Sequence, residues 1–381
     1  SVGRQLISDV PLGAFLSGGI DSSAVVAMMR ELETNSVLTC SIGFNEKLYD
    51  ESKYAAMVAK AKATDHKSEV VETSDYGLLE KLVGIYDEPY ADSSAIPTYR
   101  VCQLARKHVT VALSGDGGDE NFIGYRRYRL FAMEQKMRSM FPERFRESVF
   151  GALGRHYPKL DWAPRVFRGK TTFQALARNP MAAYLHGVSI FPEEGREQLF
   201  SEAFKRDLQG YRSSEVYEGY LAGKEFEDPM RMVQYLDFKT YLPGDILTKV
   251  DRASMAHSLE VRVPFLDHTF VDWAAGLPTG SKLRGGTGKH VLKESLRPLL
   301  PHEVLFRSKM GFAVPIETWF RGSLKDRIGE TVRGDRLKQS GIFKPECLNR
   351  LVEEHQSGKR SWSPVLWALL MFDGFLERQG A

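Results

Sequence analysis

Runs of strand character alternate with helical segments through the first third of the chain, and this alternation restricts the fold more than any other feature. Runs typical of buried strands occur at residues 12–16, 37–44 and 109–113, and a short strand is expected at residues 68–71. Apolar residues at helical spacing occupy the segments between and beside them, at residues 21–32, 51–63, 75–86 and 95–108. Strands alternating with helices predict a parallel α/β sheet flanked by helices.

Beyond about Tyr125 the strand pattern stops. Residues from there to about Tyr235 have the pattern of amphipathic helices rich in Arg, Glu and Phe, which prolines divide into segments. The last part is also mostly helical, ending in an apolar helix at residues 363–377. We therefore predict an α/β domain over residues 1–130, a helical insertion over 131–235 and a helical part over 236–381 that completes the active site.

Composition excludes several classes of protein. The 381 residues are 43% hydrophobic and 27% charged, as in folded proteins rather than disordered chains. A formal net charge of +3 is too small to indicate nucleic acid or membrane, so any anion site must be local. The cysteines at 40, 102 and 347 lack metal-type spacing and favour a reducing compartment. With neither a membrane-length apolar run nor a signal peptide, we expect a cytoplasmic protein.

The segment SGGIDSS, residues 17–23, stands between an apolar strand and a helix. Its glycines let backbone N–H groups approach an anion, its hydroxyls add donors, and the start of the helix contributes a positive dipole. These properties describe a cradle for phosphate. The segment is neither a Walker loop, GxxxxGK[ST], nor a dinucleotide fingerprint, GxGxxG. The alternative is a plain Ser/Gly turn capped by Asp21.

A second turn, SGDGGDE at residues 114–120, follows the strand at 109–113. Carboxylates beside a phosphate site suit Mg²⁺, which proteins hold through one or two carboxylates together with substrate phosphates. Ligands of parallel α/β sheets bind at the carboxyl ends of strands, so we expect both turns at one edge of the sheet. Alone, this turn would be an ordinary acidic turn, but two such turns after parallel strands favour a joint site.

The sequence resembles a known family at these and other segments. SGGIDSS is similar to the pyrophosphatase loop of the ATP-pyrophosphatase (PP-loop) superfamily, and the wider pattern resembles the C-terminal synthetase domain of glutamine-hydrolysing asparagine synthetases. The matching segments are DVPLGAFLSGGIDSS, SIGF, YDESKYA, DEPYADSSAIPT, LSGDGGDE, ILTKVDRASMAHSLEVRVPFLD, GTGKHVLKE and KMGFAVPIETWF. The resemblance implies an adenine nucleotide alpha hydrolase-like sheet of five or so parallel strands with a large helical region.

The resemblance also implies ATP and Mg²⁺ as cofactors. Members of the family activate a carboxylate by attack on the α-phosphate of ATP, release pyrophosphate, and form an acyl-adenylate that ammonia opens to an amide. By resemblance, Mg²⁺ binds Asp21 and Asp119. The residues that correspond to ATP contacts are Leu16, Ser17, Gly18, Gly19, Asp21, Ser22, Ile42, Gly43, Ser114 and Gly115.

Two residues are expected to be catalytic. Asp116 corresponds to an acidic residue that the family needs to form the acyl-adenylate; many asparagine-forming members have Glu there, which leaves the substrate geometry open. Lys289, in GTGKHVLKE, corresponds to a lysine that stabilises the pyrophosphate and the adenylation transition state. Without the family, a solvated lysine near a helix start would be the ordinary interpretation.

Three further residues are candidates for the substrate pocket, and each has a structural alternative. Lys249 or Arg252 facing the triphosphate is one interpretation; the other is a buried ion pair, with Arg262 nearby, that anchors the helical region to the sheet. Glu88, in the DEPYADSS loop, is a candidate contact for the carboxylate substrate or ammonia, and equally an ordinary loop acid.

Two departures from the family pattern stand out. Asparagine synthetases of this type begin with a glutaminase domain whose N-terminal Cys attacks glutamine, whereas Ser1 begins this chain just before the phosphate turn. We expect the synthetase part of a longer amidotransferase; use of free ammonia or a separate partner is the alternative. Residues 120–125, ENFIGY, replace the ELFGGY common in relatives. Ile123 in place of Gly bears on how closely the loop approaches its ligand and on whether aspartate is the substrate.

We therefore predict ATP-dependent synthesis of asparagine from aspartate, with ammonia derived from glutamine on a missing N-terminal domain. Alternatives within the superfamily are exopolysaccharide amidotransferases, β-lactam synthetases and peptide cyclases. An alternative of another class is a non-catalytic nucleotide-binding module; Asp21, Asp116, Asp119 and Lys289 occurring together argue against it. We expect no nucleic-acid or membrane partner, and a homodimer is one option.

Overall fold

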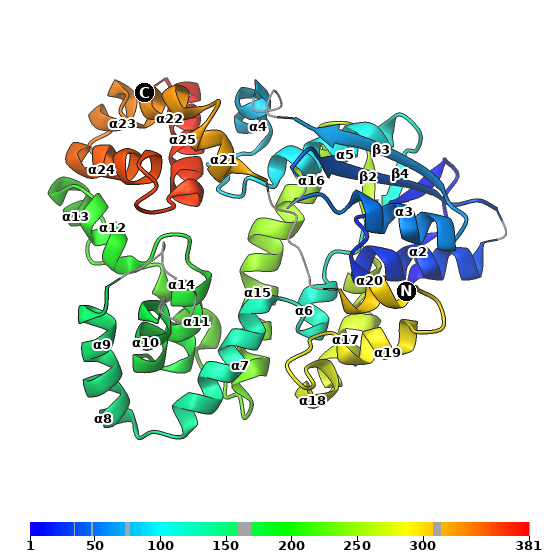
Figure 1. Ribbon diagram of the computed structural model, residues 1–381, viewed down its shortest axis with the longest axis horizontal. Coiled ribbons are helices and arrows are strands. Elements are labelled where there is room, and N and C mark those ends of the chain that lie inside the picture. The colour runs from blue at the N-terminus through cyan, green and yellow to red at the C-terminus, as the bar shows by residue number, and fades with distance from the viewer. Residues whose placement is uncertain (34, 47–48, 73–76, 159–168, 308–313, 381) are drawn as a thin grey trace. The chain divides into compact units, whose positions relative to one another are not determined.

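The computed structural model describes residues 1–33, 35–46, 49–72, 77–158, 169–307 and 314–380 (Figure 1). Contacts within the chain group into two units, which are described separately. Unit 1 comprises Ser1–Tyr86, Ser93–Tyr125 and Asp237–Pro315. Unit 2 comprises Asp87–Asp92, Arg126–Leu236 and Ile316–Ala381. None of the described helices is both long and apolar enough to span a bilayer.

Unit 1 contains a parallel sheet of five strands in the order β3-β2-β1-β4-β5. The strands are β1 (Leu12–Phe15), β2 (Leu38–Phe44), β3 (Asp65–Val71), β4 (Val111–Leu113) and β5 (Glu260–Arg262). All neighbouring strands pair in parallel, and β1 lies between β2 and β4, with Gly13 opposite both Leu38 and Ala112. The predicted parallel α/β sheet is confirmed. β5, only three residues long, adds a strand inside a segment with no strand pattern.

Helices lie on both faces of this sheet. The chain runs outward from β1 to β2 and β3, then returns to β4 on the other side of β1 and continues to β5. Because crossovers between parallel strands are right-handed, connections that run in opposite directions lie on opposite faces. α2 (Ile20–Leu32) and α3 (Ser52–Ala61) therefore cover one face, and α5 (Ala95–Arg106) and α16 (Thr248–Met255), which pack together, cover the other (Figure 1).

A hydrophobic core joins α2 and α3 to the sheet and to later helices of unit 1. Val26 and Ala27 of α2 are fully buried in it, together with Leu16 just after β1. Residues of α17 (His268–Gly276), α19 (His290–Leu296) and α20 (His302–Phe306) complete the same core. Among its described residues, unit 1 also contains the helical segments α1 (Val2–Gln5), α4 (Leu79–Ile85), α6 (Gly118–Phe122), η4 (Leu242–Leu247), η5 (Pro264–Leu266) and α18 (Thr279–Lys282). This core fixes α19 close to the start of α2.

Unit 2 is helical throughout its described part, as predicted for residues 125–235. Its first helices are α7 (Arg126–Ser139), α8 (Glu143–Phe145), η2 (Arg146–Phe150), α9 (Gly151–His156), α10 (Lys170–Ala177), α11 (Pro180–Val188), α12 (Glu193–Leu199), α13 (Glu202–Asp207), α14 (Ser214–Leu221) and α15 (Pro229–Lys239), which ends within unit 1. Prolines mark helix starts, as Pro180 does after the Asn179 cap, whose side chain accepts from Ala182 N at 2.8 Å.

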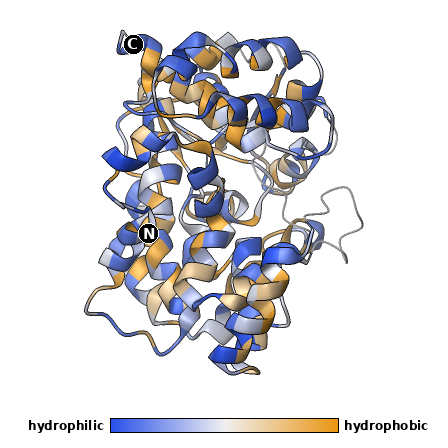
Figure 2. Ribbon diagram, turned by 90° about the vertical axis from the view of Figure 1, so that its left-hand side faces the viewer, coloured by the Kyte–Doolittle hydropathy of each residue, from blue (hydrophilic) through white to orange (hydrophobic). Residues whose placement is uncertain are grey.

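The C-terminal helices of unit 2 pack around large apolar side chains. They are α21 (Ile316–Arg321), α22 (Lys325–Val332), α23 (Asp335–Gln339), α24 (Pro345–Gln356) and α25 (Ser363–Arg378). Phe320 and Trp367 are fully buried among them. Figure 2 shows amphipathic helices, as expected, with hydrophobic residues along one side and hydrophilic residues along the other.

Candidate active site

The two glycine turns predicted from the sequence follow neighbouring strands. Residues 16–19 join β1 to α2, and residues 114–117 join β4 to α6. The direction of the sheet order reverses between β1 and β4, because β2 and β3 lie on one side of β1 whereas β4 and β5 lie on the other. Ligands of open α/β sheets bind beyond the carboxyl ends of the strands at such a switch point. The topology thus places both turns where a ligand is expected.

Hydrogen bonds among serine hydroxyls and backbone groups shape the first turn. Ser17 N donates to Ser22 Oγ at 3.2 Å, the two serine hydroxyls lie 3.1 Å apart, and Ser22 Oγ donates to Gly19 O at 3.2 Å. Gly19 N donates weakly to Ser17 Oγ at 3.3 Å. The turn therefore winds around its own hydroxyls at the start of α2, so that hydroxyl and N–H donors gather in one place, as phosphate binding needs.

Close packing explains two of the glycines. Gly18 has a φ of +71°, and a Cβ there would lie 2.5 Å from Ala55 N and 2.6 Å from Tyr54 Cβ, at the start of α3. A Cβ on Gly115 would lie 2.5 Å from Ser22 N. The second turn thus rests directly on the first turn of α2, which confirms that the two turns meet.

Lys289 joins the two turns electrostatically. Its Nζ contacts Asp21 Oδ2 and lies 2.7 Å from Asp119 Oδ1. Only 3% of the lysine is exposed, and each carboxylate side chain is about one-sixth exposed, at 16% and 15%. Burial by itself lowers the pKa of Lys289, but the carboxylates of Asp119 and Asp21 outweigh it and hold the pKa above its ordinary value. A buried ammonium whose charged form is favoured therefore stands between two carboxylates at the switch point.

Unusual backbone geometry brings Lys289 to this position. It precedes α19 with a φ of +57°, and its N–H donates to Phe122 O at 2.8 Å. A Cβ on Gly288 would lie 2.1 Å from Ile123 O, and a Cβ on Gly124 would lie 2.0 Å from Lys289 Cε. The segment before α19 and the end of α6 thus pack with no space for side chains, and this packing fixes the lysine.

Ile123, which departs from the family pattern, has a strained backbone conformation. It has a φ of +55° and a ψ of +50°, in the left-handed region where a β-branched residue is strained by about 1–2 kcal/mol. Glycine, which the resemblance leads us to expect at this position, carries no such strain. The Ile123 side chain is fully buried. The departure therefore strains the backbone at the residue whose carbonyl packs against Gly288.

The carboxylates of Asp21 and Asp119 suit Mg²⁺. Both contact the same ammonium nitrogen, so one oxygen of each can reach a common cation. The described part of the chain contains no group of three or more His, Cys, Asp and Glu able to hold a metal. Mg²⁺ commonly uses one or two protein carboxylates and takes its other ligands from substrate phosphates and water. The donor set therefore fits this ion together with a polyphosphate.

The second turn carries two further acids. Ser114 Oγ donates to Asp116 Oδ2 at 2.6 Å, which orients that carboxylate within the turn. Glu120, which was given no role from the sequence, is 1% exposed and accepts a hydrogen bond from Tyr125 Oη at 2.7 Å. Burial, reinforced by Asp119, raises the pKa of Glu120 to about 7. The turn thus presents an oriented acid at Asp116 and a weakly acidic carboxyl at Glu120.

Other predicted residues lie on or beside strands β1 and β2 and on helix α16. Leu16 is fully buried and its N–H donates to Cys40 O at 2.8 Å, while Ile42 and Gly43 lie near the carboxyl end of β2. Lys249 is 7% exposed and its Nζ donates to Ser94 Oγ at 2.8 Å.

The environments of Arg252, Arg262 and Glu88 differ from that of Lys249. Arg252 is exposed on α16. Arg262 donates to backbone carbonyls of the N-terminal segment at 2.7 Å. Glu88 lies in the Asp87–Asp92 segment, which groups with unit 2. The structure thus brings Lys249, but not Arg252, into the interior of unit 1.

Arg307 was not among the predicted residues. Its guanidinium donates to Gly18 O from Nη2 at 3.1 Å and from Nε at 3.3 Å. The only sequence signal was its place two residues before the family-like segment at residues 309–320, since no local pattern relates position 307 to position 18.

These features define a doubly wound α/β domain with a phosphate-type turn and a two-carboxylate, one-lysine cluster at its switch point. The model of the asparagine synthase family matches residues 1–377, and the chain belongs to this family. It is 35% identical to asparagine synthetase [glutamine-hydrolyzing] 1 of Bacillus subtilis over 98% of this chain and 57% of that protein. It is 34% identical to a putative asparagine synthetase [glutamine-hydrolyzing] of Mycobacterium tuberculosis, over 98% of this chain and 55% of that protein.

A more distant relative has a different name. Amidase chry2 of Gibberella zeae is 26% identical over 89% of this chain and 54% of that protein. The chain spans somewhat more than half the length of each of these relatives.

Proposed function

We propose that the protein forms an amide bond at the expense of ATP through an acyl-adenylate. The substrate is aspartate and the product asparagine, with ammonia derived from glutamine in a part of the protein outside this chain. Membership of the asparagine synthase family and the names of the relatives support the proposal. The observation that carries it is the cluster of Lys289, Asp21 and Asp119 beside the serine turn, at the ligand-binding edge of the sheet.

Each part of the site has a role in this reaction. The N–H and hydroxyl donors of residues 17–22 bind the β- and γ-phosphates of ATP. An oxygen of the aspartate side-chain carboxylate attacks the α-phosphorus, and the bond from that phosphorus to the pyrophosphate oxygen breaks. Lys289 supplies a fixed positive charge where the departing pyrophosphate gathers negative charge, an interaction that strengthens toward the transition state.

The carboxylates complete the charge balance. Asp21 and Asp119 would hold Mg²⁺, which when bound neutralises part of the polyphosphate charge. Asp116, oriented by Ser114, is the acid that we assign to formation of the acyl-adenylate. Ammonia then attacks the activated carbonyl carbon, AMP leaves with the former carboxylate oxygen, and the nitrogen loses a proton to give the neutral amide.

Exchange of labelled pyrophosphate into ATP tests the proposal. We expect exchange that requires both Mg²⁺ and aspartate, and Asp21→Ala should abolish it while leaving the far-ultraviolet circular dichroism unchanged. Asparagine formation from ammonia, in the absence of glutamine, would then test the second half of the reaction. Normal exchange by Asp21→Ala would contradict the assignment of this residue to the metal and phosphate site.

A second candidate is a related acyl-adenylate enzyme that amidates or cyclises another carboxylate. Two observations favour it: the similarity to amidase chry2 of Gibberella zeae and the strained Ile123 beside Lys289. Exchange that fails with aspartate but proceeds with another carboxylic acid would keep the mechanism and change the substrate. ATP binding without exchange for any tested acid would favour a non-catalytic nucleotide-binding module.

A further inference from the structure

Arg307 connects the phosphate turn to the start of α3. Besides its two hydrogen bonds to the Gly18 carbonyl, its Nη1 lies 2.6 Å from Glu51 Oε1, and its guanidinium stacks over the Tyr54 ring at 4.4 Å from the centroid. The Arg307 and Glu51 side chains are only 10% and 12% exposed. Three different contacts thus hold one planar guanidinium, which limits its freedom to move.

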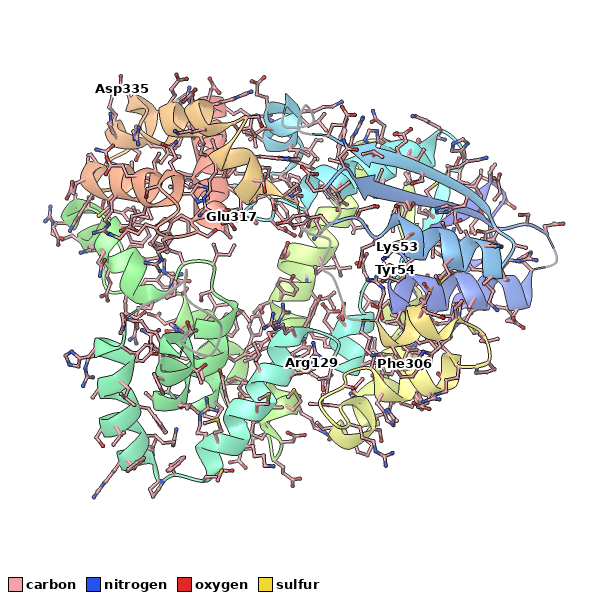
Figure 3. All side chains as sticks on the ribbon, in the orientation of Figure 1. Lys53, Tyr54, Arg129, Phe306, Glu317 and Asp335 are labelled. Atoms are coloured by element: carbon pink, nitrogen blue, oxygen red, sulfur yellow. The ribbon has the colours of Figure 1, made fainter. Side chains whose placement is uncertain are left out.

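A second cation also lies over the Tyr54 ring. Lys53 Nζ lies 4.7 Å from the centroid of the same ring, and Figure 3 labels Lys53 and Tyr54 at the start of α3. Tyr54 N donates to Glu51 O at 2.9 Å, so the ring and the carboxylate that hold Arg307 belong to one rigid helix start. The start of α3 therefore holds the Arg307 guanidinium in one position.

Arg307 in turn orients the peptide between Gly18 and Gly19. In a trans peptide the C=O and the following N–H point in opposite directions. Arg307 holds the Gly18 carbonyl on the α3 side, which turns the Gly19 N–H to the opposite side, where it meets Ser17 Oγ at 3.3 Å. Without that hold, this peptide rotates more easily, because neither glycine has a Cβ to limit φ and ψ.

We propose that Arg307 is a positioning residue of the phosphate turn: by clamping the Gly18 carbonyl against α3, it directs the Gly19 N–H toward the β- and γ-phosphates of ATP. This inference rests on the proposed function. It assigns Arg307 to the affinity for polyphosphate and not to the nucleoside or to the carboxylate substrate.

Calorimetric titration with Mg²⁺ and ATP, pyrophosphate or AMP tests the inference. Arg307→Ala should weaken ATP and pyrophosphate about 10- to 100-fold, the range of one lost hydrogen bond to a charged group, and leave AMP within about twofold. Arg307→Lys should stay at least about fivefold weaker for ATP, because lysine keeps the charge and lacks the planar fork. Equal weakening of AMP and ATP, or full recovery with lysine, would overturn the proposal.

Arg297→Ala is the matched control. Its guanidinium lies 5.0 Å from the centroid of Phe306, which is labelled in Figure 3, and it pairs with Glu294 on the surface at 2.6 Å. This change removes the same type of side chain without touching the turn, so ATP affinity should stay within about twofold, as is usual for a surface pair. An equal loss in the control would contradict a specific role for Arg307.

Hydrogen exchange separates this inference from the proposed function, because it needs no ligand. The peptide carrying residues 16–23 should exchange faster in Arg307→Ala, and in Glu51→Gln if Arg307→Ala does not fold, while Arg297→Ala matches the wild type. If hydrogen exchange of residues 16–23 were unchanged in Arg307→Ala, the positioning role of Arg307 would be refuted, even in a protein that binds ATP. Faster exchange in a protein that binds no ATP would keep the clamp as a structural contact, overturn its role in phosphate binding, and count against the proposed function.

Discussion

Replacing Lys289 by methionine removes the charge at the centre of the site while keeping most of the side-chain volume. The lysine is 3% exposed and contacts carboxylates on both turns, so the change leaves Asp21 and Asp119 facing each other without a counter-charge. Breaking a buried pair in this way costs about 3–5 kcal/mol of folding free energy. Removal of one preorganised charge from a developing anion lowers the rate by about 10²–10³-fold.

Two measurements separate these effects. Urea unfolding gives the loss of stability, and ATP–pyrophosphate exchange gives the loss of adenylation. Lys107→Met is the control: its ammonium pairs with Glu69 at 2.6 Å on the surface, where a pair contributes about 0–1 kcal/mol. We expect a clear loss for Lys289→Met and almost none for the control.

A triple variant sharpens the test further. Combining Lys289→Met with Asp21→Leu and Asp119→Leu removes the charges together, and replacement of a whole buried ion cluster by apolar residues of similar volume is often close to neutral for stability. The triple variant should therefore regain most of the unfolding free energy and none of the exchange activity. If Lys289→Met were as stable as the wild type and exchanged pyrophosphate at the normal rate, the assigned role of the cluster would be wrong.

Three other changes test separate parts of the structure. Gly288→Ala should lower exchange at least about tenfold, because its Cβ would lie 2.1 Å from Ile123 O and displace the adjoining lysine; normal activity would contradict the close packing. Burial lowers the pKa of His355 to about 4, so the unfolded state binds a proton more readily than the folded state between pH 7 and pH 5. This group should therefore lower the free energy of unfolding by about 2 kcal/mol when the pH falls from 7 to 5. His355→Gln should remove that part of the fall in urea titrations, and an unchanged pH dependence would contradict it. Arg146 is 9% exposed and donates to the carbonyls of Leu176 and Arg178 at 3.3 Å, at the end of α10. Arg146→Met should destabilise unit 2 by about 1.5–3 kcal/mol, measured by hydrogen exchange of α10, and unaltered exchange there would refute this.

Much of the α/β architecture follows from local patterns in the sequence. Four of the five strands and the helices between them were predicted because apolar runs and glycine turns are local signals. The edge strand β3 begins at Asp65, earlier than the strand predicted at 68–71, because its polar side chains are partly exposed and leave no apolar pattern. β5 has three residues, none of them fully buried, so no strand pattern marks it. The predicted helix at 75–86 begins in residues outside the described part, which contains α4 from Leu79.

The site was predicted in pieces, and only the fold joins them. The rule for carboxyl strand ends brought the two turns together from sequence, and the packing of Gly115 on Ser22 bears this out. Family resemblance assigned Lys289 and the two aspartates separate roles, whereas the geometry makes them one cluster. The left-handed backbone at Lys289 and the contact from Arg307 to the first turn join residues far apart in sequence, and no local pattern encodes such contacts.

The transfer of oxygen from substrate to AMP tests the central claim most directly. Aspartate labelled with ¹⁸O in its side-chain carboxylate would be incubated with the protein, ATP, Mg²⁺ and ammonia, and the nucleotide products analysed by mass spectrometry. An acyl-adenylate predicts one labelled oxygen in AMP and none in pyrophosphate, because the carboxylate oxygen stays on the α-phosphorus when ammonia displaces AMP. Label in inorganic phosphate with ADP as the nucleotide product, or unlabelled AMP formed alongside the amide, would contradict the account.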